Sequence, residues 1–198
     1  MPRPPSDRPV RIADAALQLI AAAGLHAVTH RAIDARLELP PGTTSYYART
    51  RAELVTRALD LLVERYNETM VDFPLARIHT DEEAIQVVVA TTTLMESREA
   101  DQIAHFVLLI DLRHVPDLHA LINAHSPGQV RIEALAAQLI RQCGIPDAEE
   151  HARGLVAVLV GLMLARLAGG SDVSIEKTVR TYWQGMAVAR DRSQGQDA

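Results

Sequence analysis

The chain has 198 residues, of which 48% are hydrophobic and 23% charged, and its formal net charge is −5. This composition is that of a globular protein and excludes a disordered chain; the length suits one large domain, or a small domain joined to a larger one. The single cysteine, Cys143, excludes an internal disulfide framework and an all-cysteine zinc site. The longest apolar run, 155–165, is too short to cross a bilayer, and the polar residues 1–9 do not resemble a secretory signal. We therefore expect a cytoplasmic protein without a membrane partner.

Hydrophobic residues recur at intervals of three and four along most of the chain, and no stretch shows the sustained alternation of a half-buried strand. Helix starts are marked at Thr50, Thr80 and Ser126, each of which stands three residues before Glu or Gln, as in a capping box. The pattern predicts an all-α fold of about nine helices, over residues 9–23, 30–37, 41–47, 51–72, 81–96, 99–113, 117–143 (broken near Pro127), 147–168 and 174–190.

Basic residues gather near the beginning of the chain, although the chain as a whole is acidic. Residues 1–58 hold eight arginines and five acidic residues, a net charge of +3, whereas the remainder carries −8. Such an asymmetry is a modest indication of a polyanion-binding end.

Two short predicted helices, 30–37 and 41–47, are separated by only three residues. Helices this short need packing to be stable, and two of them across a tight turn, docked on a longer helix, form the helix-turn-helix plan. The second helix consists mainly of hydroxyl residues and two tyrosines, which can contact phosphates and base edges. Arg49 and Arg51 follow at the start of the next helix, beside free backbone N–H groups that favour phosphate. On the residues alone, the alternative of a polar turn whose tyrosines pack on the core stays open.

The stretch from Arg11 to about Leu59 resembles the DNA-binding domain of the tetracycline repressor family. The resemblance is carried by a combination of short matches: Ile12, Ala15, Ala16, Leu19, Ile20, Gly24, Thr29, Ile33, the run Pro41 to Tyr47, and the run Arg49 to Leu54. A subgroup of that family carries Pro-Gly-Thr-Thr-Ser followed by Arg-Thr-Arg, and this sequence resembles that subgroup.

The sequence also departs from the family pattern. Glu38 stands where the family usually has Gly, which argues against a left-handed turn residue. Ala48 stands where the family usually has Phe, so a smaller side chain packs behind the second short helix. Three further departures are Pro40 for Ser or Thr, Ser45 for a common Tyr, and Arg51 for Lys.

The resemblance implies an N-terminal three-helix helix-turn-helix DNA-binding domain, residues 1–50, and a larger helical domain for effector binding and dimerisation, residues 51–198. It also implies a homodimer on a double-stranded DNA operator, with Arg51 in the phosphate contact usually made by Lys. The residues expected to contact DNA are Thr29, His30, Arg31, Pro41, Thr43, Thr44, Ser45, Tyr46, Tyr47, Arg49 and Arg51.

The last two predicted helices are rich in apolar residues. Helix 147–168 is apolar almost all round and must be buried on most sides. The resemblance implies that both helices pair with their copies in a two-fold bundle, whereas a monomer core is the alternative. The residues expected at this interface are Leu155, Leu159, Leu162, Val179, Tyr182, Trp183 and Met186.

Helix 99–113 is apolar except for a few positions, of which His105 is the most informative. A buried polar group needs a partner, so His105 either bonds Asp101 one turn earlier or anchors a small-molecule effector. The expected pocket residues are Met70, Phe73, Thr92, Met95, His105, Phe106 and Leu109.

No histidine spacing places two metal ligands on one helical face, and no catalytic motif is present, so we expect no metal, no cofactor and no enzyme activity. The leading hypothesis is a ligand-responsive repressor that binds a palindromic operator as a homodimer. The alternatives are a helical sensor or carrier of small molecules without operator binding, and a helical metal-dependent enzyme that would use His105.

Overall fold

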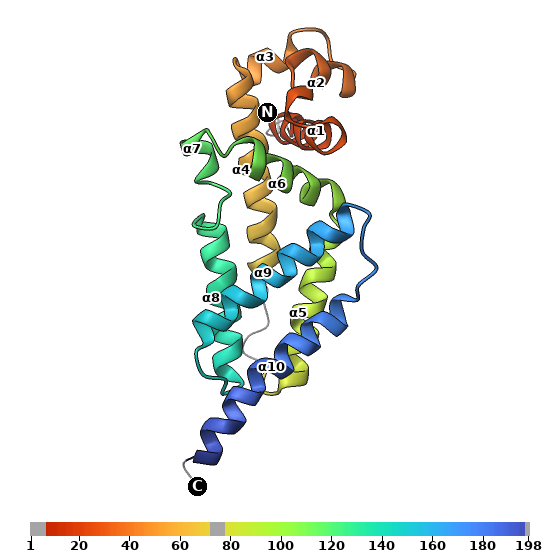
Figure 1. Cartoon of the computed structure of the whole chain (residues 1–198). Helices are drawn as coiled ribbons and strands as arrows, with labels where there is room; N and C mark the ends of the chain where they lie inside the picture. Colours follow the sequence, from red (N-terminus) through yellow and green to blue (C-terminus); the bar gives the residue numbers. More distant parts are fainter. Residues whose placement is uncertain (1–6, 72–77, 197–198) are drawn as a thin grey trace, which may run out of the picture. The chain divides into compact units, whose positions relative to one another are not determined.

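The computed structural model describes residues 7–71 and 78–196, which contain helices and no strand. The all-α fold predicted from the sequence is therefore confirmed. In chain order (Figure 1) the elements are α1 (Arg8–Ala23), the 3-10 helix η1 (Leu25–Ala27), α2 (His30–Arg36), α3 (Thr43–Tyr47), α4 (Arg51–Val71), α5 (Asp81–Glu96), α6 (Glu99–Asp111), α7 (Pro116–His119), α8 (Pro127–Gln142), α9 (Ala148–Leu167) and α10 (Ile175–Gln196). No helix in these ranges is both long enough and apolar enough to pass through a bilayer.

The described chain divides into two compact units, and neither is continuous in sequence. Unit 1 runs to residue 68 and includes 99–126, whereas unit 2 comprises 69–98 and the residues from 127 onward. The division at residue 50 that the sequence predicts concerns function, and it stays a prediction.

Unit 1 forms around the apolar face of α1. Ile12, Ala16 and Ile20, spaced four apart, are fully buried, and α1 packs against α6. Residues from α2 and α4, among them Ile33 and Leu59, complete the same hydrophobic core. The short helices α2 and α3 are therefore held by tertiary packing, as their length requires.

A partly buried ionic contact also ties unit 1 together. The guanidinium of Arg65 on α4 donates to Asp14 on α1 at 2.5 Å and to Asp101 on α6 at 2.7 Å. Burial by itself would lower the pKa of Arg65, but the hydrogen bond to Asp14 and the charge of Asp101 more than offset it and raise the pKa. Three helices are thus joined through one charged side chain.

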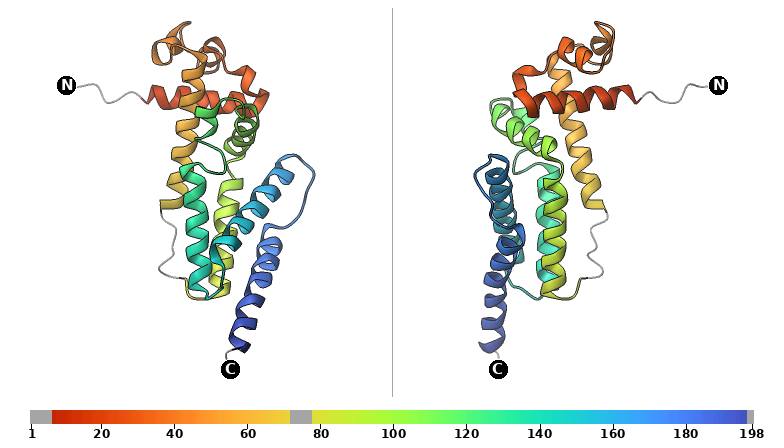
Figure 2. Two further views of the ribbon diagram at one scale, coloured as in Figure 1. Left: turned by 60° about the vertical axis from the view of Figure 1, so that its left-hand side comes forward. Right: turned by 90° about the vertical axis from the view of Figure 1, so that its right-hand side faces the viewer.

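Unit 2 consists of α5, α8, α9 and α10. Helix α9 packs along α8, α10 packs along α5, and α9 and α10 also contact each other, as both ribbon figures show (Figures 1 and 2). At the contact between α9 and α10, an added Cβ at Gly154 would lie 2.1 Å from the Tyr182 hydroxyl oxygen, so a larger residue at this position would displace the Tyr182 ring. Two bidentate ion pairs add to the packing: Arg190 with Asp81, and Arg180 with Glu82.

The core of unit 2 contains most of the residues that the sequence predicts at a dimer interface. Trp183 is 1% exposed and Val179 fully buried within a single chain, where they pack with residues of α5 and α8. The buried members of that set, namely Leu155, Leu162, Val179, Trp183 and Met186, belong to the core of one chain, whereas Leu159 and Tyr182 are half-buried against it. The physical reason is that α5 and α8 already cover the apolar stripes of α9 and α10.

Helix starts follow the predicted capping signals in most respects. Thr80 and Glu83 form a complete capping box at α5. At α4 the capping box is incomplete. The Thr50 hydroxyl accepts a hydrogen bond from the Glu53 N–H, but the Glu53 carboxylate accepts from the N–H of Arg49 rather than from that of Thr50. The break near Pro127 is confirmed, because α7 ends at His119 and α8 begins at Pro127.

Candidate nucleic-acid interface and ligand pocket

The turn between α2 and α3 is tight and has a left-handed residue. Thr29 caps α2 by accepting a hydrogen bond from the N–H of Ala32 at 3.1 Å. After the helix, Glu38 adopts a φ of +53°, which corrects the expectation that a non-glycine residue would avoid this conformation. The N–H of Leu39 then donates to the Asp34 carbonyl at 2.8 Å, which closes the turn.

A buried carboxylate fixes the start of α3 against α2. Asp34 is 5% exposed, and it accepts hydrogen bonds from the Gly42 N–H at 2.8 Å, the Thr44 N–H at 2.8 Å and the Thr44 hydroxyl at 2.6 Å. Burial alone would raise the pKa of this carboxyl, but the hydrogen bonds from Thr44 and Gly42 outweigh it and hold the pKa below its usual value. The charge therefore persists at neutral pH and orients α3.

Sequence reasoning missed Asp34, although a signal was present. A helix that begins with glycine and threonine leaves N–H donors unsatisfied, and an acidic residue in the preceding helix can accept from them. The same contact also explains why α3 begins at Thr43 rather than at Pro41, because Gly42 is its N-cap with a φ of +87°.

The structure separates the predicted DNA-contacting residues of α3 into two faces. Tyr46 is 84% exposed, and Ser45 and the preceding Pro41 are also exposed. Thr43 is half-buried, and its hydroxyl donates to the Pro40 carbonyl at 2.7 Å. These residues occupy the outer face of α3.

The inner face of α3 holds the other two residues of that prediction. Thr44 is fully buried, which corrects its assignment to an exposed contact surface, because its hydroxyl serves Asp34 instead. Tyr47 is half-buried against the core of unit 1, with its ring centroid 5.2 Å from that of Tyr46 in an edge-to-face arrangement. Ala48, fully buried, fills the position behind α3 despite its small size.

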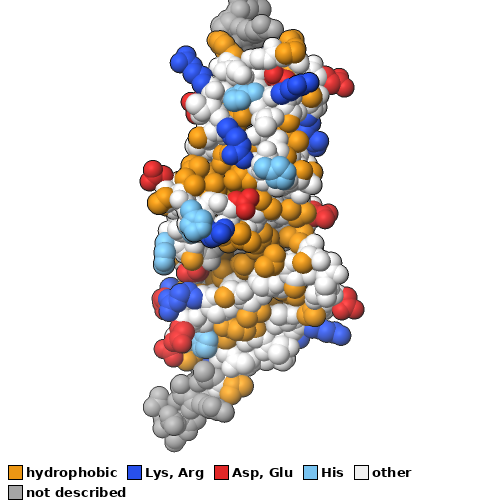
Figure 3. All heavy atoms as spheres, turned by 45° about the horizontal axis from the view of Figure 1, so that its top comes forward, with side chains coloured by type: hydrophobic (Ala, Val, Ile, Leu, Met, Phe, Trp, Pro, Cys, Tyr) orange, Lys and Arg blue, Asp and Glu red, His pale blue; other side chains and the backbone are white. Residues whose placement is uncertain are grey.

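The cationic residues around α3 differ in how they are held. Arg31 and Arg49 are exposed, and within the described residues their guanidinium groups have no hydrogen bond or ion pair. Arg51 donates to the carbonyls of Val28 at 3.1 Å and Leu25 at 2.6 Å, and so fastens α4 to the segment before α2. His30 makes a 2.7 Å hydrogen bond between its Nε2 and the Ala48 carbonyl. Figure 3 shows the Lys and Arg side chains dispersed among apolar and uncharged atoms rather than gathered in one patch.

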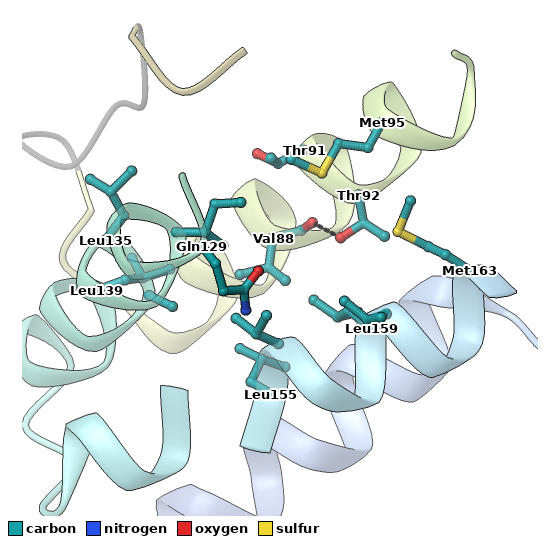
Figure 4. A pocket seen from close by; sticks show the side chains of 14 residues that line it. Val88, Thr91, Thr92, Met95, Gln129, Leu135, Leu139, Leu155, Leu159 and Met163 are labelled. Atoms are coloured by element: carbon teal, nitrogen blue, oxygen red, sulfur yellow. Dashed lines mark hydrogen bonds between the residues drawn. The ribbon is translucent and has the colours of Figure 1, made fainter. Parts of the chain in front are cut away.

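Unit 2 contains a pocket between α5, α8 and α9. Its volume is about 110 Å³, and its lining includes Thr92 and Met95, both predicted pocket residues, together with Leu155 and Met163 of α9 (Figure 4). Thr92 is 4% exposed, and its hydroxyl donates to the Val88 carbonyl at 2.7 Å. Sequence reasoning missed most of the lining, because the pocket depends on how α8 crosses α9.

The other predicted pocket residues lie elsewhere. His105, Phe106 and Leu109 are on α6 in unit 1, where the ring centroid of His105 is 5.5 Å from those of Tyr66 and Phe106. Asp101 pairs with Arg65 rather than with His105, so the alternative of an Asp101–His105 bond is wrong. His105 Nδ1 is buried without a hydrogen-bond partner among the described residues. Phe73 falls outside the described residues, as does the side chain of Met70.

In the ranges that the structure covers, no group of three or more His, Cys, Asp or Glu side chains is placed to hold a metal ion.

Solved structures with the same fold are transcriptional regulators and ligand-binding proteins. A transcriptional regulator from Rhodococcus sp. Rha1 has a TM-score of 0.75 and 18% identity over 90% of this chain and 95% of its own. A regulator from Saccharomonospora viridis in complex with choline has a TM-score of 0.65 and 21% identity over 89% and 93%. The multidrug binding protein EbrR, complexed with malachite green, has a TM-score of 0.64 and 23% identity over 91% and 98%. No curated protein matches the chain.

The fold, with a helix-turn-helix before a larger helical domain, defines the class of ligand-responsive DNA-binding transcriptional regulators. The family model described as tetracyclin repressor-like, C-terminal domain, matches residues 79–187, which is more than half of the chain. The chain therefore belongs to the tetracycline repressor-like family.

Proposed function

We propose that this protein is a repressor that binds a palindromic operator as a homodimer and leaves it when a small-molecule effector binds. The observation that carries this proposal is the exposure of Tyr46 on a helix whose orientation is fixed by Asp34. Tyr46 is 84% exposed, and its only described ring contact is the edge of Tyr47, so most of its surface is free to contact bases and sugar in the major groove.

The DNA-contacting surface that we propose comprises the outer face of α3 and the flanking cations. Ser45 and Tyr46 face base edges, while Arg31 and Arg49 contact phosphates on either side. Further contacts to the DNA phosphate backbone come from four neighbouring residues, Thr29, His30, Thr43 and Arg51. We also assign the chain to the subgroup with a Pro-Gly-Thr-Thr-Ser recognition helix, residues 41–45.

The dimer that we propose forms through the exposed faces of α9 and α10. On α9 and at its C-cap, the exposed residues Ala157, Gly161, Leu164 and Ala168 recur at intervals of four, three and four. On α10 the exposed residues Lys177, Thr181, Gln184 and Val188 recur at the same intervals. Each set forms one stripe on its helix; the small and apolar α9 stripe allows close helix pairing across a two-fold axis, whereas the α10 stripe is mixed and includes Lys177 and Gln184.

The dimer is tested by Leu164→Glu, because Leu164 is 44% exposed at the centre of the α9 stripe. A charge there should leave folding intact and shift the protein to monomer in light scattering. Leu94→Glu is the matched control, since Leu94 is 48% exposed on α5. A Leu164→Glu variant that stays dimeric would contradict this interface.

Effector control requires only that the ligand binds the DNA-incompetent arrangement more tightly. A preference of a few kcal/mol suffices to reverse the balance between two dimer arrangements. We place the effector in the pocket of unit 2.

The experiment that tests the proposal is selection of binding sites from a random duplex pool at near-physiological salt. Wild-type protein should recover a palindrome whose half-sites are separated by about one helical turn, about 34 Å. Tyr46→Ala should fold normally and fail to recover it. Sequence-blind binding that is equal in both proteins would overturn the assignment of α3 as the recognition helix.

A further inference from the structure

The pocket of unit 2 is lined by 14 side chains, and none of them carries a charge. Eleven are aliphatic or thioether groups, including the Met95 and Met163 side chains that approach it from α5 and α9 (Figure 4). The three polar exceptions are Thr91, Thr92 and Gln129. An ion placed here would lose its hydration without gaining an opposite charge, which is strongly unfavourable.

Two acidic residues next to the lining are already engaged in contacts. Glu96, the residue after Met95, forms an ion pair with Arg166 of α9. Glu133, one turn beyond Gln129, accepts a hydrogen bond from the Gln129 amide at 3.0 Å. Moving either carboxylate toward a cationic ligand would therefore break an existing contact, so the walls select against both cations and anions.

The Thr92 hydroxyl is the most deeply buried polar group of the lining, and it can only accept a hydrogen bond from a ligand. The Thr92 hydroxyl uses its one proton in the 2.7 Å bond to the Val88 carbonyl, which leaves oxygen lone pairs for another partner. Because Thr92 is 4% exposed, a ligand donor that reaches this oxygen would form its hydrogen bond away from water.

The size of the pocket limits the ligand further. Its volume is about 110 Å³. An apolar cavity of about 150 Å³ in another protein holds benzene, so a pocket somewhat smaller than this encloses no more than about one small ring.

We propose that the effector is a neutral, largely apolar molecule of about one ring that donates a hydroxyl or N–H hydrogen bond to Thr92 Oγ1. This inference rests on the proposed function, because it names the ligand class of the same effector site. It also separates this chain from two proteins of the same fold, whose bound ligands, choline and malachite green, carry positive charge.

The test is titration calorimetry of the full chain, without DNA, against four probes of similar size. We expect 4-methylphenol to bind most tightly and toluene more weakly, while choline and benzoate show no binding. Binding of choline or benzoate as tight as that of 4-methylphenol would overturn the proposal, as would the absence of binding by both neutral probes.

Variants locate the binding. Thr92→Val keeps the shape of the side chain and removes the acceptor, so it should weaken 4-methylphenol about fivefold and leave toluene unchanged. Thr93→Val is the matched control, because Thr93 is exposed on the same helix and outside the lining. Ala136→Leu should fill the pocket and abolish binding of both neutral probes. Unchanged affinities in Thr92→Val and Ala136→Leu, with circular dichroism as in wild type, would refute this site.

Different results would contradict the proposed ligand class and the proposed regulatory role. Operator release is measured separately, as the loss of operator binding when 4-methylphenol is added at saturating concentration. If the neutral probes bind in the pocket and the operator stays bound, the ligand class stands and the regulatory role is wrong. If the operator is released by choline but not by neutral probes, the regulatory role stands and the ligand class is wrong.

Discussion

The carboxylate of Asp34 on α2 accepts two hydrogen bonds from one residue of α3, the N–H of Thr44 at 2.8 Å and its hydroxyl at 2.6 Å. Together with the bond from Gly42, these contacts set the angle at which α3 leaves α2. A five-residue helix has too few internal hydrogen bonds to hold its own orientation. The direction in which Tyr46 faces solvent therefore depends on a residue that itself touches no DNA in our proposal.

Asp34→Asn should destabilise unit 1 and weaken operator binding together. The amide retains one oxygen but presents an N–H₂ group to a backbone donor, so the unfolding free energy should fall by about 2 kcal/mol. Urea denaturation of wild type and variant measures this change. Asp60→Asn is the control, because Asp60 is exposed on α4, and it should change stability by less than about 0.5 kcal/mol.

The same carboxyl predicts a pH dependence with a defined sign. Because the folded pKa of Asp34 lies below 3.8, its stabilisation is complete above that value and is lost as pH falls through the folded pKa. Asp34→Asn should therefore flatten the acid limb of the stability curve. An acid limb of unchanged slope would contradict the role given to Asp34.

Arg49→Gln should change the salt dependence of operator binding more than its sequence preference. One lost phosphate contact lowers the slope of log affinity against log salt by about 1. Filter binding at several salt concentrations measures the slope. Arg57→Gln is a suitable control, because Arg57 is exposed on α4 outside the proposed surface. Equal slopes for wild type and Arg49→Gln would remove Arg49 from the phosphate contacts.

Much of the fold could be predicted from the sequence because its helices carry local signals. The period of apolar residues, the Thr80 capping box and the break at Pro127 each fix a helix without reference to the rest of the chain. The interface residues lack such a local signal. The sequence pattern of an apolar stripe on α10 is the same whether α5 or a second chain covers it. Only the tertiary structure shows that Trp183 is covered by its own chain.

The candidate site was predictable only where it is exposed. Tyr46 and Arg49 follow from residue type, whereas the burial of Thr44 depends on its contact with Asp34, ten residues earlier. The pocket lining depends on the crossing of α8 and α9, which no periodicity within one helix encodes. A glutamate at position 38 predicts a turn without a left-handed residue, but the tight connection between α2 and α3 imposes that conformation on Glu38.

Glu38→Gly should therefore stabilise the protein. A left-handed conformation costs a side-chain-bearing residue about 1–2 kcal/mol, and glycine's greater freedom in the unfolded chain offsets part of the gain, so we expect about 0.5–1 kcal/mol. Thermal denaturation measures the change. Asp147→Gly is an informative comparison, because Asp147 has a similar φ of +51° and aspartate tolerates this region better. A loss of stability in Glu38→Gly would mean that the Glu38 side chain makes a compensating interaction.

His105 should make the stability of unit 1 sensitive to mild acid. Burial lowers its pKa from 6.5 to about 4, and the groups around it are the rings of Tyr66 and Phe106, while Asp101 on its own helix is paired with Arg65. The unfolded chain thus binds a proton between pH 6.5 and 4 that the folded chain does not, so stability is full above about 6.5 and declines as pH falls through this window. The loss of unfolding free energy approaches about 3 kcal/mol at the lower end of this pH window.

His105→Phe should remove this pH dependence, whereas His114→Phe, at an exposed position, should retain it. Urea denaturation at pH 7, 5.5 and 4.5 checks the difference, and a decline of equal size in His105→Phe would assign the sensitivity to another group.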